Sequence, residues 1–195
     1  MHAERTIETL QKTGSLLEGH FVLTSGRHAG QYIQCARLFE YPAHSAQLCA
    51  ELAQQLSAVQ AELVVGPALG GVIFAYELAR ALGVRNIFAE RESGAMTLRR
   101  GFAIEPGTRV VIAEDVVTTG GSVREVIEVV RAAQGEVVAV AAIADRSGGQ
   151  ADFGVPLVSL LSLDIPSYGA DRCPLCDKGL PLIKPGSRTL PVAWA

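Results

Sequence analysis

The chain has 195 residues, a length that favours one compact domain with an appendage over two domains. Its 17 Lys and Arg residues nearly balance its 20 Asp and Glu residues, and this net charge of −3 excludes a disordered polyelectrolyte and argues against a surface that binds nucleic acid. Four cysteines are too few for a disulfide scaffold, and no apolar run is long enough to cross a membrane. The chain does not open with a basic segment followed by an apolar one, as a secretory leader would. We therefore expect a soluble cytoplasmic protein.

The first 56 residues predict two helices that flank a pair of short strands. Apolar residues at helical spacing precede a glycine that can end a helix, and Pro42 is placed like the first residue of the next helix. A turn-rich stretch separates two short apolar segments between them. In chain order, the expected elements are a helix around Ile7 and Leu10 ended by Gly14, strands at Phe21–Leu23 and Tyr32–Ile33 joined by Thr24–Arg27, and a helix from Pro42 to Leu56.

From residue 63 onward, short apolar strands alternate with helices. Strands that are apolar throughout and alternate with helices predict a parallel sheet covered on both faces. Ligands of such sheets bind in the loops that follow the strands, and after Leu163 the pattern fades into a tail that contains Pro, Gly and Cys. The expected strands are Leu63–Val65, Asn86–Ala89, Arg109–Ala113 and Val137–Ala144, and the expected helices run from about Val72 to Leu82 and from Val123 to Ala133, the second closed by Gly135.

The strand that ends at Ala113 leads into an acidic pair and a loop of small residues. Glu114 and Asp115 follow the strand directly, and Ser122 with Glu125 has the spacing of a capping box, which predicts a helix start at Ser122. Backbone N–H groups, hydroxyls and the positive helix end would together bind an anion. The loop lacks the Gly-Lys-Ser/Thr of nucleotidases and the glycine spacing of dinucleotide-binding folds. Its residues are Val116, Val117, Thr118, Thr119, Gly120, Gly121 and Ser122.

An anion-binding loop directly after two carboxylates suits a ribose 5-phosphate, which offers a phosphate and a vicinal diol. The thirteen residues from Val110 to Ser122 resemble the phosphoribosyl diphosphate (PRPP) signature of type I phosphoribosyltransferases; an ordinary strand–turn–helix with a capped helix is the alternative. The resemblance implies an α/β fold, a parallel sheet flanked by helices with a small hood. A single domain would span residues 1–195, with a core at 42–150 and with 1–40 and about 157–195 in the hood or tail.

Three further segments resemble orotate phosphoribosyltransferases. Phe21 to Arg27, followed by Tyr32, is similar to that family's N-terminal substrate segment, and Gly66 to Gly71 is similar to its diphosphate loop. Arg146 stands after a strand, where the family places an arginine on the orotate carboxylate, and the fork of a guanidinium suits a planar anion. The resemblance implies transfer of phosphoribosyl from PRPP to orotate in pyrimidine biosynthesis, giving orotidine 5′-phosphate and diphosphate.

The chain differs from the better-known branch of that family in the basic residues of its expected site. Thr24 and Gly70 stand where that branch has lysines, and the flexible loop at residues 90–101 contains no lysine. Arg91, Arg99 and Arg100 are then the loop cations able to neutralise a departing diphosphate; we expect Arg91 and one of the other two to do so, with Gly94 and Gly101 permitting loop motion. The alternative is that these arginines are solvated or paired with Glu90 and Glu92.

The resemblance also implies a role for each part of the site. Glu114, Asp115 and Arg91 would be catalytic, the carboxylates holding the ribose hydroxyls. Mg²⁺ would be held mainly by PRPP rather than by protein ligands, and the enzyme would be a homodimer whose loop 91–101 is shared across subunits. PRPP would also contact Ala68, Leu69, Gly70, Arg99, Arg100 and the loop from Val116 to Ser122, and orotate would contact Thr118, Arg146, Tyr32 and Ile33.

Two rival functions and one metal motif stay open. A phosphoribosyltransferase for a purine base would share the phosphate loop, and a PRPP-sensing regulator could dispense with catalysis. Cys173 and Cys176 have the spacing of half a zinc site, but no second Cys or His pair follows them. Either a zinc ion is shared by four thiolates across a dimer, or the cysteines lie in a turn begun by Pro174; we favour the turn.

Overall fold

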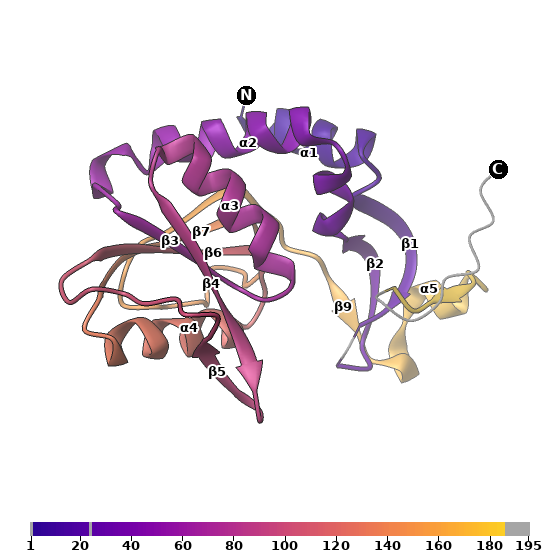
Figure 1. Cartoon of the computed structure of the whole chain (residues 1–195). Helices are drawn as coiled ribbons and strands as arrows, with labels where there is room; N and C mark the ends of the chain where they lie inside the picture. Colours follow the sequence, from indigo (N-terminus) through magenta and orange to yellow (C-terminus); the bar gives the residue numbers. More distant parts are fainter. Residues whose placement is uncertain (1, 24, 186–195) are drawn as a thin grey trace.

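The computed structural model describes residues 2–23 and 25–185, so the prediction for Thr24 lies outside the described residues. Figure 1 shows an α/β body with a smaller sheet at one end. Within the described part of the chain, no helix is long and apolar enough to cross a membrane.

The body is built on a six-stranded sheet of order β5-β4-β3-β6-β7-β8. All neighbouring strands are parallel except β4 and β5, so the predicted parallel sheet is confirmed. β8 lies at the edge of this sheet, although the sequence assigned residues from about 157 onward to the hood or tail. The strands are β3 (Leu63–Pro67), β4 (Arg85–Glu92), β5 (Ala95–Leu98), β6 (Arg109–Val117), β7 (Glu136–Asp145) and β8 (Leu157–Ser162).

Helices cover both faces of this sheet, α1, α2 and α3 on one side and α4 on the other (Figure 1). Each side has its own apolar layer, with Leu52 and Phe74 fully buried in one and Val126 and Val130 in the other. The predicted helices are confirmed to within two residues where the sequence set bounds. The helices are α1 (His2–Lys12), α2 (Pro42–Gln55), α3 (Gly70–Leu82) and α4 (Gly121–Ala132), with single 3-10 turns at Cys35–Glu40 and Ser57–Val59.

Both ends of the chain form a second sheet of order β10-β1-β2-β9, which we call the hood. The hairpin β1–β2 is antiparallel and overlaps the two predicted extended segments, although both strands start earlier than predicted and Leu23 lies outside β1. The C-terminal residues that showed no pattern in the sequence supply two short strands and a helix. The hood elements are β1 (Leu16–Val22), β2 (His28–Ile33), β9 (Ser167–Tyr168), a 3-10 turn at Ala170–Arg172, α5 (Pro174–Asp177) and β10 (Leu182–Ile183).

The structure corrects three local predictions. β6 continues through the acidic pair to Val117 instead of ending at Ala113. The capping box is wrong: Gly120 in a left-handed conformation is the N-cap of α4, and Ser122 is the second helical residue with no side-chain cap bond. After α4, the left-handed residue is Gln134 rather than Gly135.

A further correction concerns the segment at residues 90–101. Instead of an irregular loop, β4 and β5 form an antiparallel hairpin in which Arg91 pairs with Met96. Ser93 and Gly94 make its turn, both with positive φ.

The closest packing in the body lies between β3 and α3. A Cβ on Gly66 would stand 2.5 Å from the carbonyl oxygen of Gly71 and 2.8 Å from Cβ of Ala75. A Cβ on Gly71 would stand 2.8 Å from the carbonyl oxygen of Ala113 on the next strand. These two glycines therefore allow α3 to begin directly over the end of the sheet.

We expect Gly66→Ala to lower the free energy of unfolding by about 1–3 kcal/mol, because the added methyl group must displace backbone. Gly30→Ala is the matched control, since its new Cβ would meet nothing closer than Leu175 Cδ1 at 3.8 Å. Urea unfolding of both variants measures the difference, and equal stability of the two variants would contradict the close approach.

Candidate active site

The carboxyl ends of β6 and β7 meet at one edge of the sheet and place the predicted site residues together. Val117 pairs with Asp145 at the last rung, and the backbone N–H of Arg146 donates to the carbonyl oxygen of Val117 at 2.8 Å. Asp145 Oδ1 accepts from the backbone N–H of Ser147 at 2.8 Å, which fixes the turn that follows β7. The acidic pair of β6 and the arginine after β7 are therefore neighbours.

Two hollows open at this edge and share Val116, Thr118 and Thr119. The smaller has a volume of about 230 Å³ and contains Glu114, the loop from Val116 to Ser122 and Arg91 in its lining. The larger has a volume of about 680 Å³ and lies between body and hood, with Asp115, Gly70 and Arg146 among its lining residues. Most of the residues predicted to bind PRPP and orotate thus line two connected cavities.

The smaller hollow lies at the start of α4, where the sequence predicts an anion-binding loop, and we call it the anion cradle. Gly120 has φ +74°, and a Cβ there would lie 2.7 Å from the Phe153 ring, so this position requires glycine. Arg124 stacks over Phe153 at 5.2 Å and donates from Nη1 to the carbonyl oxygen of Thr119 at 2.6 Å. Arg124, which the sequence reasoning missed, therefore holds the backbone of the cradle.

The acidic pair is strongly perturbed. Burial, the adjacent Asp115 charge and a side-chain hydrogen bond between the two carboxyl groups raise the pKa of Glu114 to about 8. Burial also raises the pKa of Asp115, opposed by the backbone N–H of Val116, which donates to Asp115 Oδ1 at 2.8 Å. Both shifts favour the protonated carboxyl group over the carboxylate, and a cationic or hydroxyl-rich ligand would act against them.

The larger hollow has in its wall a guanidinium, that of Arg146, for which the described residues supply no ion pair. Arg146 Nε is buried and has no hydrogen-bond partner among the described residues, and burial lowers the pKa of this guanidinium. The pKa of Tyr32 is raised by burial, with Arg146 acting against the shift. Ile33 lines the same cavity, as do Leu23 and Ser25 of the predicted substrate segment, and the hood adds Ile165 and Ser167, which the sequence did not indicate.

The predicted diphosphate loop lies beside this cavity, between β3 and α3. Gly70 lines the cavity, and a Cβ there would stand 3.4 Å from Asp115 Oδ1. The peptide bond between Ala68 and Leu69 is cis. The backbone N–H of Ala68 donates to the carbonyl oxygen of Ala89 at 2.7 Å, and the side chain of Leu69 is exposed to solvent. Neither residue lines the cavity.

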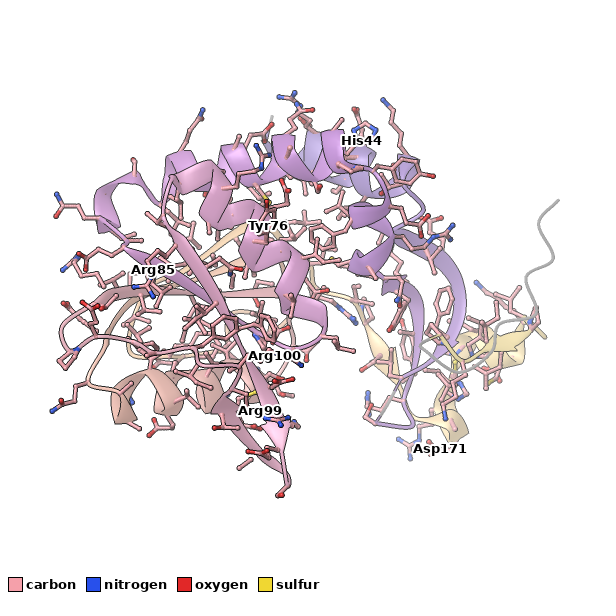
Figure 2. The ribbon with its side chains drawn as sticks, viewed as in Figure 1. His44, Tyr76, Arg85, Arg99, Arg100 and Asp171 are labelled. Carbon is pink, nitrogen blue, oxygen red and sulfur yellow. The ribbon has the colours of Figure 1, made fainter. Side chains whose placement is uncertain are left out.

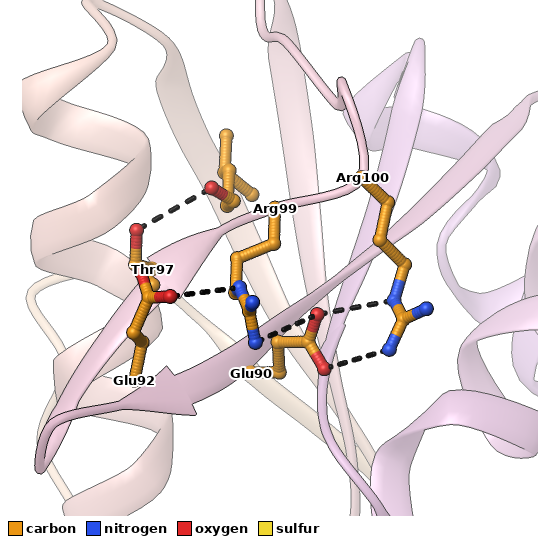
Figure 3. A network of polar contacts seen from close by, with 6 residues as sticks. Glu90, Glu92, Thr97, Arg99 and Arg100 are labelled. Carbon is orange, nitrogen blue, oxygen red and sulfur yellow. Dashed lines mark hydrogen bonds and ion pairs between the residues drawn. The ribbon is translucent and has the colours of Figure 1, made fainter.

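The three loop arginines separate onto two faces of the β4–β5 hairpin. Arg91 faces α4, where its guanidinium contacts Glu125 at 2.7 Å in the lining of the anion cradle. On the opposite face, Figure 3 shows Arg100 on Glu90 at 3.0 Å and Arg99 on Glu92 at 3.2 Å. Arg99 and Arg100 are thus paired with Glu90 and Glu92, the alternative that the sequence left open for the loop arginines. Arg91 instead lies in the lining of the anion cradle.

The raised pKa of Glu114 makes a prediction about stability. An acid that binds its proton more tightly in the folded state destabilises that state as pH rises from the ordinary value of 4.5 to about 8. Between pH 5 and pH 9, the wild-type chain should lose roughly 1–4 kcal/mol more unfolding free energy than Glu114→Gln, which cannot ionise. Urea unfolding at both pH values tests this, and parallel pH profiles would show that Glu114 ionises normally.

The site geometry agrees with comparisons against known proteins. The model of the phosphoribosyl transferase domain matches residues 40–153. Relatives named orotate phosphoribosyltransferase are 57% identical over 183 residues in Thermotoga maritima (94% of this chain, 98% of the relative) and 54% identical over 188 residues in Caldicellulosiruptor bescii (96% and 99%). The crystal structure of orotate phosphoribosyltransferase from Aeropyrum pernix has a TM-score of 0.65 and 32% identity, covering 80% of this chain and 92% of that one. The chain therefore belongs to the orotate phosphoribosyltransferase family.

Proposed function

We propose that this chain transfers the phosphoribosyl group of PRPP to orotate, which yields orotidine 5′-phosphate and diphosphate for pyrimidine synthesis. The observation that carries the proposal is the buried, unpartnered Nε of Arg146 in a cavity that joins the anion cradle at Thr118 and Thr119. An anionic planar base and a ribose phosphate fit these two sites at once.

The ribose would bind at the junction of the two cavities. The cradle from Thr118 to Ser122 holds the 5′-phosphate through backbone N–H groups and hydroxyls at the start of α4. Glu114 and Asp115 lie directly before it and accept hydrogen bonds from the ribose hydroxyls. Their negative charge also stabilises the positive anomeric carbon that forms as the base nitrogen displaces diphosphate.

The base would bind between the body and the hood. Arg146 offers a fork of N–H groups to the carboxylate of orotate, and Tyr32 and Ile33 form the opposite wall. Adenine and xanthine carry no carboxylate, so they would leave Arg146 without its partner. The same guanidinium therefore selects orotate over purine bases.

Mg²⁺ is the cofactor that we propose for this reaction. Two half-buried carboxyl groups whose pKa values are raised suit a ligand that brings a cation with it, because a nearby cation restores their ionised form. The metal would be held mainly by oxygens of PRPP, with Glu114 and Asp115 as the nearest protein carboxylates. When bound, it neutralises charge on the departing diphosphate.

We also propose a cytoplasmic homodimer in which the β4–β5 hairpin is shared. Leu69, Ile73 and Tyr76 form an exposed apolar row that begins just before α3, with exposed fractions of 88%, 53% and 57%. α3 packs against β4, and Figure 2 labels Tyr76 on α3 above Arg100 and Arg99 on the hairpin side. In a dimer whose partner covers this row, the charged face of the hairpin would reach into the partner's site, where Arg99 and Arg100 would contact diphosphate. Arg91 would instead act at the anion cradle of its own chain.

Arg146→Ala should lower kcat/KM for orotate about 100-fold or more, because an unpaired buried carboxylate loses roughly 3 kcal/mol. Arg146→Lys should recover part of the loss, since a lysine keeps the charge but not the fork. The KM for PRPP should stay nearly unchanged. Arg131→Ala is the control, because Arg131 is exposed on α4 and pairs with Glu128. Unaffected orotate turnover in Arg146→Ala would disprove this base site.

Sharing of the hairpin can be tested by complementation. Asp115→Asn and the double variant Arg99→Ala/Arg100→Ala should each be nearly inactive alone. If the hairpin crosses, a mixture refolded or co-expressed in equal amounts should regain about a quarter of the wild-type activity, because half of the random dimers are mixed and each has one intact site. The same mixture with Arg91→Ala should stay inactive, since Arg91 acts within its own chain. Absence of recovery with the double variant would show that the hairpin is not shared.

A further inference from the structure

Four side chains with metal-binding atoms meet inside the hood, away from the substrate cavities. They are His20, His28, Cys173 and Cys176, and their ligand atoms all lie within 4.8 Å of one another. His28 pairs with Val22 across the β1–β2 hairpin, two residues from His20, and the two imidazole rings meet edge to face with their centroids 4.8 Å apart. The cysteines lie at the start and inside of α5, which Figure 1 shows beside β1 and β2.

We propose that these four residues form a structural zinc site. The nitrogen-to-sulfur distances are 3.5 Å from His20 Nε2 to Cys173 Sγ, 3.7 Å from His20 Nε2 to Cys176 Sγ and 3.3 Å from His28 Nδ1 to Cys176 Sγ. Tetrahedral zinc with bonds of about 2.3 Å to sulfur and 2.0–2.1 Å to nitrogen places such atoms about 3.5 Å apart. The two nitrogens lie 2.9 Å apart and need to separate by only a few tenths of an ångström to reach the same geometry.

The surroundings of His20 orient it as a ligand. His20 Nδ1 lies 2.9 Å from the carbonyl oxygen of Leu180, so it carries the proton and donates it there. This tautomer leaves the lone pair on Nε2, the atom that faces the cluster. A backbone carbonyl on the far nitrogen of a ligating histidine is the usual second partner of a metal site.

Burial and chemistry favour zinc over other ions. His20, His28 and Cys173 are 2%, 5% and 1% exposed, so the site is closed except at Cys176, which is exposed and gives an ion access. Two thiolates balance the double charge of Zn²⁺, and together with two imidazoles they complete its tetrahedral coordination. Mg²⁺ and Ca²⁺ instead prefer oxygen ligands. With four protein ligands no position is left for substrate, so the site is structural.

The C-terminal part of the hood needs such an anchor. Among residues 164–185, all of which the structure describes, Cys173 is the one buried side chain. Its strands pair over two residues each, β9 with β2 and β10 with β1. A segment with so little apolar burial gains its stability from a cross-link, and zinc would join residues 153 positions apart in the chain.

This anchor also bears on the base cavity, because Ile165 and Ser167 of the same segment line it together with Tyr32. Arg27 donates from Nε to Ser167 Oγ at 2.8 Å and ties the hairpin to the segment a second time. A metal that holds α5 on the hairpin therefore keeps the wall of the orotate site in place. The metal site itself does not depend on which base binds.

The test uses the untagged full-length chain produced with added zinc, and the variants Cys176→Ser and Cys49→Ala. Cys176 is exposed, so its substitution disturbs packing little, and Cys49 is a buried cysteine of α2 outside the cluster. Mass spectrometry of the metal content should find about one zinc per chain in the wild type and in Cys49→Ala, and less than about a tenth of that in Cys176→Ser. Chelation should lower the melting temperature of the wild type, and zinc should restore it.

Cobalt gives a readout that needs no variant. Co²⁺ added to the metal-free wild-type chain should produce intense tetrahedral d–d bands and thiolate charge-transfer absorption, which zinc then displaces. The proposal is overturned if the wild-type chain holds no zinc and shows no cobalt bands, if Cys176→Ser keeps its zinc, or if Cys173 and Cys176 are isolated as a disulfide without metal. Each of these results is a readout of metal binding or of the cysteines and not of orotate turnover, so the two proposals fail independently.

Discussion

Two adjacent carboxyl groups at the end of β6 are the constraint around which the substrate site is arranged. Glu114 and Asp115 are held in a strand rather than in a loop, which fixes their backbone positions, and partial burial raises the pKa of each. Ionised, the pair destabilises the empty site; with ribose hydroxyls and a bound cation, the same charges are satisfied. A substrate that binds here therefore gains binding free energy, because the site is preformed and its two carboxyl groups lack partners that stabilise their charge.

The strands beside β6 keep this arrangement rigid. Parallel pairing with β7 brings the backbone N–H of Arg146 to the carbonyl oxygen of Val117, so the arginine proposed to bind the base is positioned by the same ladder as the acidic pair. Gly66 and Gly71 bring α3 close to the end of the sheet, which places Gly70 against Asp115. The hood then closes the base end, using residues from both ends of the chain.

The sequence was most informative where a local pattern and a local chemistry coincide. Apolar strands alternating with helices predicted the parallel sheet, and the thirteen residues ending at Ser122 predicted the cradle, its acidic pair and the family. The end of β6 was missed because Glu114 and Asp115 break the apolar pattern although the strand continues. Ser122 was taken for a cap because only the fold shows that Gly120 adopts the left-handed conformation that starts the helix.

Features that depend on distant residues could not be read in this way. The β4–β5 hairpin carries charged residues on an exposed face, so it lacks the alternation that marks a half-buried strand. The C-terminal strands pair over two residues each, too few to leave a pattern. Cys173 and Cys176 lack a second ligand pair nearby in sequence, and only the fold brings them to His20 and His28. The signal that was present is the placement of those histidines eight residues apart on one predicted hairpin.

The most direct test of the account is base selectivity of the purified chain with PRPP and Mg²⁺. Orotate, adenine and xanthine are supplied in parallel, and loss of each base is followed by its absorbance. The account predicts rapid, Mg²⁺-dependent loss of orotate and no turnover of either purine. Among the three bases, only orotate carries a carboxylate that can pair with the guanidinium of Arg146. Turnover of a purine, or binding of PRPP without loss of orotate, would contradict it.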